Sequence, residues 1–171
     1  MKYFLLPIFV FLFHIPNLYS QKTILPSDEL SISGKIKTEV KFSLKELIAM
    51  ESKALPDVVI TNHLGEVKSI DKGLRGIALK PILEKLELIA GSPKEYNEFY
   101  FVFVATDGYR VVYSWNELFN TDTGNNIYII SEKDGKKMNE MEERILLITS
   151  SDLKTGRRNI KGLCKILVCR A

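Results

Sequence analysis

Short apolar runs separated by turn residues set the pattern of this chain. Phe99–Ala105 is a run of seven apolar or near-apolar residues, too short for a typical globular helix and rich in Phe and Val. It therefore predicts a strand that is covered on both faces. Asp107 and Gly108 follow as a pair that favours a type I′ hairpin, because both central positions of that turn need a positive φ. Residues 109–113 are the expected returning strand.

Three short helices are also predicted. Residues 43–46 and 114–117 each form a capping box, in which a Ser and a Glu three residues later bond each other's backbone N–H groups. The first box opens a helix over 44–50 with one apolar face, and the second opens a helix over Trp115–Phe119. A further helix is expected over 79–86, where Leu and Ile recur at helical spacing.

The remaining apolar segments are short and predict strands. Those segments are residues 30–36, 40–42, 58–61, 66–70, 125–130, 145–149 and 160–168. Strands therefore outnumber helices, and tight turns such as Asp134-Gly135 punctuate them. This order of elements predicts an α+β domain with a mainly antiparallel or mixed β-sheet and short helices, rather than a doubly wound parallel sheet.

The first 20 residues have the pattern of an export signal. Lys2 gives a short basic start, residues 3–15 are almost wholly apolar, and Pro16 ends the run. Because a membrane-spanning helix needs about 20 apolar residues, this shorter run predicts a signal peptide over 1–20, with an uncleaved anchor as the alternative. We then expect a polar linker over 21–29, one domain over 30–171, a periplasmic or secreted location, and no membrane span after cleavage.

Charge and cysteine content narrow the functional classes. Without Lys2 the chain has 23 Lys and Arg (24 minus one) against 21 Asp and Glu, a net charge of +2. This balance gives no electrostatic footprint for nucleic acid, so no nucleic-acid partner is expected. Cys164 falls in the last apolar segment and Cys169 at its edge, where an extended strand holds their Cα atoms beyond bridging distance. We therefore expect no intrachain disulfide, and a small core residue at each position.

Four stretches of the chain carry a family resemblance. They are residues 32–36 with the helix at 43–47; residues 72–79 (KGLRGIAL) with the Leu-rich helix after them; residues 105–114 (ATDGYRVVYS) with the start of the next helix; and residues 148–168. In this order and spacing they resemble the molybdopterin-binding domain of the sulfite oxidase family. The resemblance covers most of the chain after the linker, and it implies the α+β fold of that domain.

The chain departs from that family at its metal-binding position. Catalytic members carry a Cys, just after the strand that corresponds to Val58–Thr61, whose thiolate binds molybdenum; this chain has Asn62 and His63 there. The stretch that wraps the pterin is compressed to residues 65–73. A thiolate is the soft ligand that such a metal centre uses, and an amide does not replace it. The resemblance therefore implies a short, divergent member without the molybdenum-ligand Cys, and we expect no catalytic or metal-binding residues.

Candidate binding residues lie in several loops. Asn62 and His63 occupy the metal-ligand position, although His63 also suits a plain turn. Arg75 is framed by two glycines, which suits either a phosphate-contacting arginine or close packing of helix and sheet. Basic residues at 154–161 surround a glycine, in a loop that suits either an anion site or a solvated turn. The candidate ligand-binding residues are Asn62, His63, Arg75, Tyr109, Arg110, Arg157 and Arg158.

Three functional hypotheses follow, of which the first two come from different classes. The one we favour is an exported, non-catalytic domain that binds a small anionic ligand, a pterin or another exported protein and needs no cofactor. The alternative is a molybdopterin-dependent oxidoreductase whose metal is held without a protein Cys, and a third is a structural subunit with an exposed sheet edge. Patterns of other enzyme classes, such as G-x-S-x-G, the Walker loop and H-E-x-x-H, are absent from the sequence.

Overall fold

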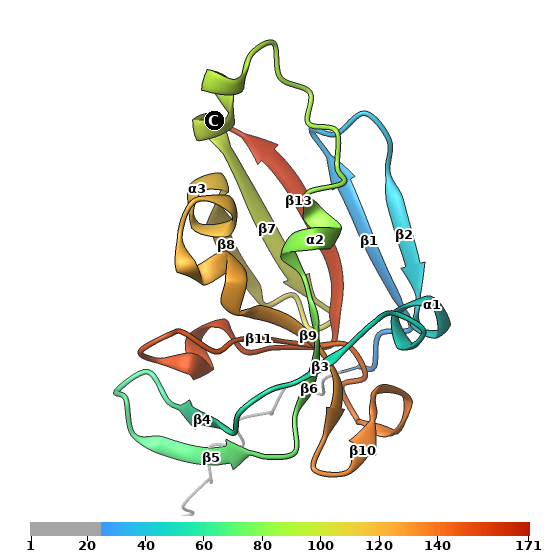
Figure 1. The fold of residues 1–171 in the computed structure, drawn as a ribbon, viewed down its shortest axis with the longest axis vertical. Coiled ribbons are helices and arrows are strands. Elements are labelled where there is room, and N and C mark those ends of the chain that lie inside the picture. The colour runs from blue at the N-terminus through green and yellow to red at the C-terminus, as the bar shows by residue number, and fades with distance from the viewer. Residues whose placement is uncertain (1–24) are drawn as a thin grey trace, which may run out of the picture.

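Two β-sheets form the framework of the protein, for which the computed structural model describes residues 25–171. The first sheet runs from top to bottom in the upper part of the molecule (Figure 1). Its strand order is β2 (Val40–Ser43), β1 (Glu29–Gly34), β13 (Leu163–Arg170), β7 (Phe99–Ala105) and β8 (Arg110–Ser114). The pair β1 and β13 is parallel, and the other neighbours are antiparallel.

The second sheet crosses the lower part of the molecule (Figure 1). Its order is β12 (Ile160–Lys161), β11 (Leu146–Thr149), β9 (Ile127–Lys133), β6 (Arg75–Ala78) and β3 (Lys53–Ala54), with β10 (Lys136–Lys137) paired to β9. A separate hairpin of β4 (Val58–Thr61) and β5 (Val67–Asp71) lies beneath it. These pairs are all antiparallel. The predicted α+β class with mixed, mainly antiparallel strands is therefore confirmed.

Short helices connect the strands. The helices α1 (Leu44–Ile48) and α3 (Trp115–Phe119) both begin with the predicted capping boxes. The helix predicted over 79–86 is reduced to α2 (Lys80–Leu83), because the chain then tightens into a turn in which the Leu86 N–H bonds the Leu83 carbonyl at 3.1 Å. The 3₁₀ helices are η1 (Pro93–Glu98), η2 (Asp122–Asn126), η3 (Met138–Glu140) and η4 (Thr155–Arg158).

Strand β7 contributes the largest apolar side chains to the core. Phe99, Phe101 and Phe103 are buried on one face, whereas the residues between them are only half-buried. The prediction that both faces are covered is wrong for the second face. The helix α3 packs over the face that carries Phe101, with the Phe101 and Phe119 ring centroids 5.9 Å apart, and the side chains of the other face are only partly covered. The four residues of β11 are all buried.

The turn after β7 is not type I′. Gly108 has a φ of 84°, but Asp107 does not adopt a positive φ. The Gly108 N–H bonds the Ala105 carbonyl at 3.0 Å, and the Ala105 N–H bonds the Tyr109 carbonyl at 2.9 Å. This is a turn with right-handed central residues followed by one left-handed glycine, the three-residue hairpin that uses the same Asp-Gly pair. The Asp134-Gly135 turn has positive φ at both residues, as a type I′ turn requires.

The predicted closing strand over 160–168 is two strands in different sheets. Gly162 has a φ of 66°, and there the chain passes from β12 in the second sheet to β13 in the first. A left-handed residue interrupts an extended ladder, and glycine adopts that conformation without a steric penalty. Similarly, β9 begins at Ile127 rather than at 125, because residues 125–126 complete η2.

The two cysteines lie on β13 as free thiols, so the prediction of no intrachain disulfide is confirmed. Both are half-buried, and the expectation of core residues is wrong because Cys169 alternates with buried Val168 and Cys164 lies at the register shift between Leu163 and Lys165. Across residues 25–171, no helix has both the length and the apolar character needed to cross a membrane. The predicted signal peptide over 1–20 lies outside the described residues.

Candidate functional site

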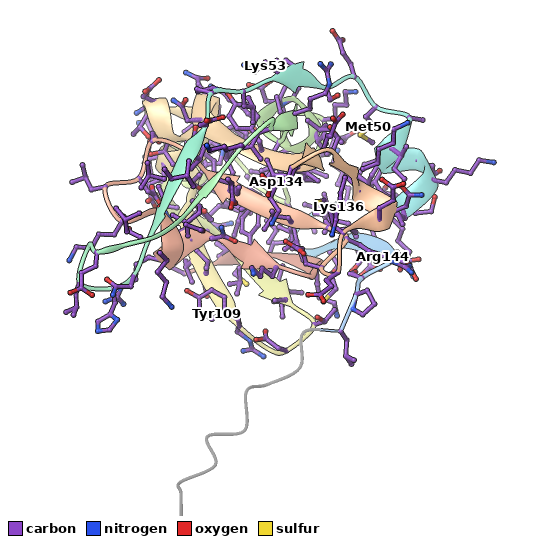
Figure 2. The ribbon with its side chains drawn as sticks, turned by 90° about the horizontal axis from the view of Figure 1, so that it is seen from below. Met50, Lys53, Tyr109, Asp134, Lys136 and Arg144 are labelled. Atoms are coloured by element: carbon purple, nitrogen blue, oxygen red, sulfur yellow. The ribbon has the colours of Figure 1, made fainter. Side chains whose placement is uncertain are left out.

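A pocket of about 430 Å³ opens on the underside of the molecule, between the β4–β5 hairpin and η4. Tyr109 from the β7–β8 turn, Lys133 from the end of β9, and Asn159 and Lys161 at β12 complete its lining. Figure 2, a view from below, shows Tyr109 on the opposite side of the molecule from Met50 and Lys53. The volume lies in the range of small-molecule sites in proteins.

Asn62 fixes the tip of the β4–β5 hairpin. Its Oδ1 accepts hydrogen bonds from the backbone N–H groups of Leu64 at 2.9 Å and Glu66 at 3.0 Å, and its Nδ2 donates to Glu66 Oε2 at 2.7 Å. An Asn that mimics backbone in this way forms an Asx turn. The amide is thus engaged inside the hairpin, and the neighbouring His63 is exposed at the pocket.

The 3₁₀ helix η4 packs directly on β4. Thr155 Oγ1 donates to the Val59 carbonyl at 2.6 Å and accepts from the Thr61 N–H at 3.1 Å. At Gly156, a Cβ atom would lie only 1.9 Å from the Thr61 carbonyl oxygen. This position therefore needs glycine because of the close approach of two backbones.

Two further hydrogen bonds set the position of Arg157. Lys154 Nζ donates to the His63 carbonyl at 3.1 Å, which ties η4 to the hairpin tip. Tyr109 Oη donates to the Arg157 carbonyl at 2.6 Å, which ties η4 to the β7–β8 turn. The backbone that carries the guanidinium is therefore held from both sides, while the side chain stays exposed at the pocket.

The lining is strongly cationic. It contains Lys68, Lys133, Arg157 and Lys161 against the single carboxylate of Asp71. Lys133 Nζ lies 3.0 Å from Glu143 Oε1. Within the described part of the chain, none of the other three cations forms an ion pair with a carboxylate. The pocket consequently carries net positive charge.

The pKa values of two buried acids near Lys133 are shifted in opposite directions. Burial raises the pKa of Asp71, which is 8% exposed, and this effect exceeds the opposing effect of Lys133 and Lys161. For Glu143, burial also acts to raise the pKa, but hydrogen bonds from the backbone and from Lys133 outweigh it and the pKa is lowered. The surroundings of Glu143 therefore stabilise its ionised form, which pairs with Lys133, whereas the surroundings of Asp71 disfavour its ionised form.

Two buried oxygen atoms in the lining have no hydrogen-bond partner among residues 25–171. They are Thr61 Oγ1 and Asn159 Oδ1. Ser131 Oγ on β9 is the other such atom in this range. A buried polar atom without a partner costs about 1–3 kcal/mol. Two unpaired atoms in one pocket indicate a place where a bound ligand or an ordered water completes the hydrogen bonding.

The structure brings together four of the seven residues predicted from the sequence. Asn62, His63, Tyr109 and Arg157 all line the pocket, although they come from two loops and η4. Arg110 does not, because it is exposed on β8 beyond the turn that carries Tyr109. The predicted ligand-binding role of these residues stays a prediction.

Arg75 and Arg158 have structural partners elsewhere. Arg75 Nη2 donates to the Ser52 carbonyl at 2.7 Å, which links β6 to the segment before β3. Arg158 Nε donates to Asp152 Oδ2 at 2.7 Å and Nη1 donates to Glu117 Oε1 at 2.9 Å. The hydrogen bond with Asp152 raises the pKa of Arg158 further. Neither guanidinium lines the pocket.

Several lining residues were missed by the sequence reasoning. These are Lys68, Asp71, Lys133 and Asn159, and Lys161 was noted only as part of the basic cluster at 154–161. They come from β5, the end of β9, the residue before β12 and the end of β12. No local pattern connects these segments, because a single lysine in a strand gives no sign of a site until the fold places it beside other cations.

The donor set of the pocket does not fit a protein-ligated molybdenum centre. Asn62 stands where the resemblance places the metal-binding Cys, and its amide is engaged in the hairpin. Neither thiol lines the pocket, and Cys164 Sγ donates instead to the Val104 carbonyl at 3.3 Å. Among the described residues, no group of three or more His, Cys, Asp or Glu side chains is placed to hold a metal ion.

The fold is similar to that of a solved sulfane dehydrogenase. The SoxCD structure from Paracoccus pantotrophus matches 85% of this chain with a TM-score of 0.64 and 10% sequence identity. The match spans 40% of the length of that SoxCD chain. No protein-family model and no curated protein matches the sequence. At this identity the similarity establishes a shared fold, and the predicted α+β fold, like that of the sulfite oxidase molybdopterin-binding domain, is the fold of this chain.

Proposed function

We propose that this protein is an exported, non-catalytic binding domain that takes a small anion in the pocket between the β4–β5 hairpin and η4. The observation that carries the proposal is the charge of the lining, four cations against the carboxylate of Asp71. Export is supported by the apolar run at residues 3–15 and its basic start.

A bound anion would reduce the charge repulsion in this pocket and would pair donors that have no partner. Like charges gathered in a partly enclosed pocket repel one another, and salt screens them less than it screens fully exposed charges. Arg157 and Lys161 lack carboxylate partners in the described residues, so their N–H groups are available for charge-assisted hydrogen bonds. The buried hydroxyl of Thr61 supplies a further donor of fixed position.

The alternative is a molybdopterin-dependent oxidoreductase. The fold similarity to a sulfane dehydrogenase supports it. The chemistry at Asn62 counts against it, because an engaged amide stands where a thiolate is required. Elemental analysis with pterin fluorescence, on folded protein from a molybdenum-replete host, separates the two. Stoichiometric molybdenum and pterin would establish the alternative, and their absence from folded protein would count against it.

Calorimetric titration with inorganic phosphate and with sulfate at low ionic strength tests anion binding. We expect Arg157→Gln and Lys161→Gln each to weaken binding by about tenfold or more, since a hydrogen bond to a charged group contributes about 1.5–3 kcal/mol. Arg110→Gln is the matched control, because this exposed arginine lies outside the lining and should keep wild-type affinity. If neither anion binds the wild type, or if Arg110→Gln loses as much affinity, the proposal is wrong.

A further inference from the structure

We propose that the pocket selects oxyanions that keep an O–H group, such as hydrogen phosphate, over oxyanions of equal charge that have none, such as sulfate. This inference rests on the proposed anion binding and adds the chemical class of the ligand. Two hydrogen-bond acceptors without donors, the carboxylate of Asp71 and Oδ1 of Asn159, carry it. They lie in a lining that is otherwise cationic.

Asp71 offers acceptor capacity to the pocket. It is the last residue of β5, opposite Val58 of β4, and it is largely buried. In the described part of the chain, no side-chain or backbone donor hydrogen-bonds its carboxylate. Lys133 and Lys161 are near enough to act on it electrostatically, yet neither forms an ion pair with it. Its lone pairs are therefore open to a bound molecule.

Asn159 offers a second acceptor of fixed position. Its Oδ1 is buried without a partner among residues 25–171, and the residue lies just before β12, two positions from Lys161. An amide oxygen accepts hydrogen bonds and never donates them. A ligand atom that reaches Asn159 Oδ1 or the Asp71 carboxylate must therefore bring its own hydrogen.

Sulfate and hydrogen phosphate differ in this one property. Sulfate has lone pairs only, so it suits Arg157 and the lysines but repels Asp71 and leaves Asn159 Oδ1 unpaired. Hydrogen phosphate carries the same double negative charge and donates one O–H to either acceptor. Sites built on buried hydrogen-bonding groups reject analogues that lack the partner by large factors, and because this pocket is open we expect a preference of about tenfold or more.

Calorimetric titrations at about pH 8 compare hydrogen phosphate, sulfate and monofluorophosphate, which are all mainly dianions at that pH, and only the first carries an O–H. We expect hydrogen phosphate to bind about tenfold or more tightly than either of the others. Asp71→Asn replaces the carboxylate by an amide that also donates, so sulfate affinity should rise and the phosphate-to-sulfate ratio should fall toward one. Asp57→Asn, an exposed acid outside the lining, should keep the wild-type ratio.

The possible results are distinguishable. Equal affinity for the three anions would overturn the selectivity and leave anion binding intact, whereas no binding of any of them would overturn both. A folded Asp71→Asn variant with an unchanged ratio would overturn the role of Asp71. If that variant does not fold, Asn159→Ala is measured instead; it removes the other acceptor, and a ratio equal to that of the wild type would then overturn the inference.

Discussion

Gly156→Ala tests whether the packing of η4 on β4 builds the pocket. A Cβ at this position would lie 1.9 Å from the Thr61 carbonyl oxygen and 3.1 Å from its carbon. Because the obstacle is backbone rather than the end of a flexible side chain, η4 must move outward by about an ångström. That movement strains or breaks both hydrogen bonds of Thr155 to β4, at 2.6 and 3.1 Å, and carries Arg157 away from the pocket.

The expected cost follows from these contacts. Overpacking costs about 1–3 kcal/mol, and a lost hydrogen bond costs about 1 kcal/mol. We therefore expect Gly156→Ala to lower the free energy of unfolding by about 3 kcal/mol, or Tm by roughly 10 °C for a domain of this size. Phosphate affinity should fall as well, measured at a temperature where the variant is folded.

Gly91→Ala is the control for this substitution. Its Cβ would meet only the half-buried end of the Glu95 side chain, with Oε1 at 2.8 Å, and no backbone atom. That carboxylate can shift, but the shift strains its hydrogen bond from the Gly91 N–H at 3.0 Å and its ion pair with Arg170 at 2.7 Å. We therefore expect a loss of about 1 kcal/mol in urea unfolding, clearly smaller than that of Gly156→Ala, and unchanged phosphate affinity. If Gly156→Ala unfolds at the same urea concentration as Gly91→Ala, the close approach of η4 and β4 is refuted.

Other substitutions test separate parts of the structure. Tyr113→Phe removes the 2.7 Å hydrogen bond to buried Thr149 and should cost about 1–3 kcal/mol in urea unfolding; an unchanged midpoint would contradict the bond. Ser114→Ala removes the N-cap of α3 and should cost about 1 kcal/mol in the same assay, and a neutral effect would contradict the cap. Because burial raises the pKa of Asp71, its ionised form destabilises the folded state at neutral pH, and the penalty disappears as pH falls through the raised folded pKa. Asp71→Asn should therefore be more stable than the wild type at neutral pH but not below the ordinary value of 3.8, and urea unfolding across pH shows whether the gain vanishes there. Cys164→Ala should change stability by about 1 kcal/mol and leave phosphate affinity unchanged, whereas lost affinity in a folded variant would contradict its place outside the pocket.

Local patterns predicted the elements whose determinants are contiguous in sequence. The capping boxes at Ser43 and Ser114 and the strand Phe99–Ala105 needed only a few neighbouring residues, and all three are present. The Asp107-Gly108 turn was assigned the wrong type, because this pair serves two hairpin geometries that differ in the φ of the Asp. In the sequence, Gly162 lies inside one apolar run, and only the structure shows that the residues before it join one sheet and the residues after it join the other.

The pocket could be predicted only in part, for a different reason. Asn62, Tyr109 and Arg157 stand beside turns, where sequence marks exposed polar residues as candidates. Lys68 and Lys133 lie within strands, and their charge matters only because the hairpin and the end of β9 meet in space. Arg158 shows the converse, since its basic loop suggested an anion site and its actual partners are Asp152 and Glu117.

The hairpin tip is compatible with the proposed anion pocket on a fold without a protein metal ligand. The side chain of Asn62 forms its hydrogen bonds with Leu64 and Glu66 inside the hairpin, so its role is to shape the turn. The charge of the pocket comes from β5, β9, η4 and β12. Lys68 belongs to the hairpin itself and η4 is tied to the tip by the bond of Lys154 to the His63 carbonyl, whereas Lys133 and Lys161 lie on strands of the second sheet. If this position corresponds to the metal-binding Cys, as the resemblance implies, an amide there removes the soft-metal chemistry and leaves the cationic lining in place. The proposed ligand agrees with that change, because nitrogen donors suit a hard oxyanion better than a metal held by sulfur.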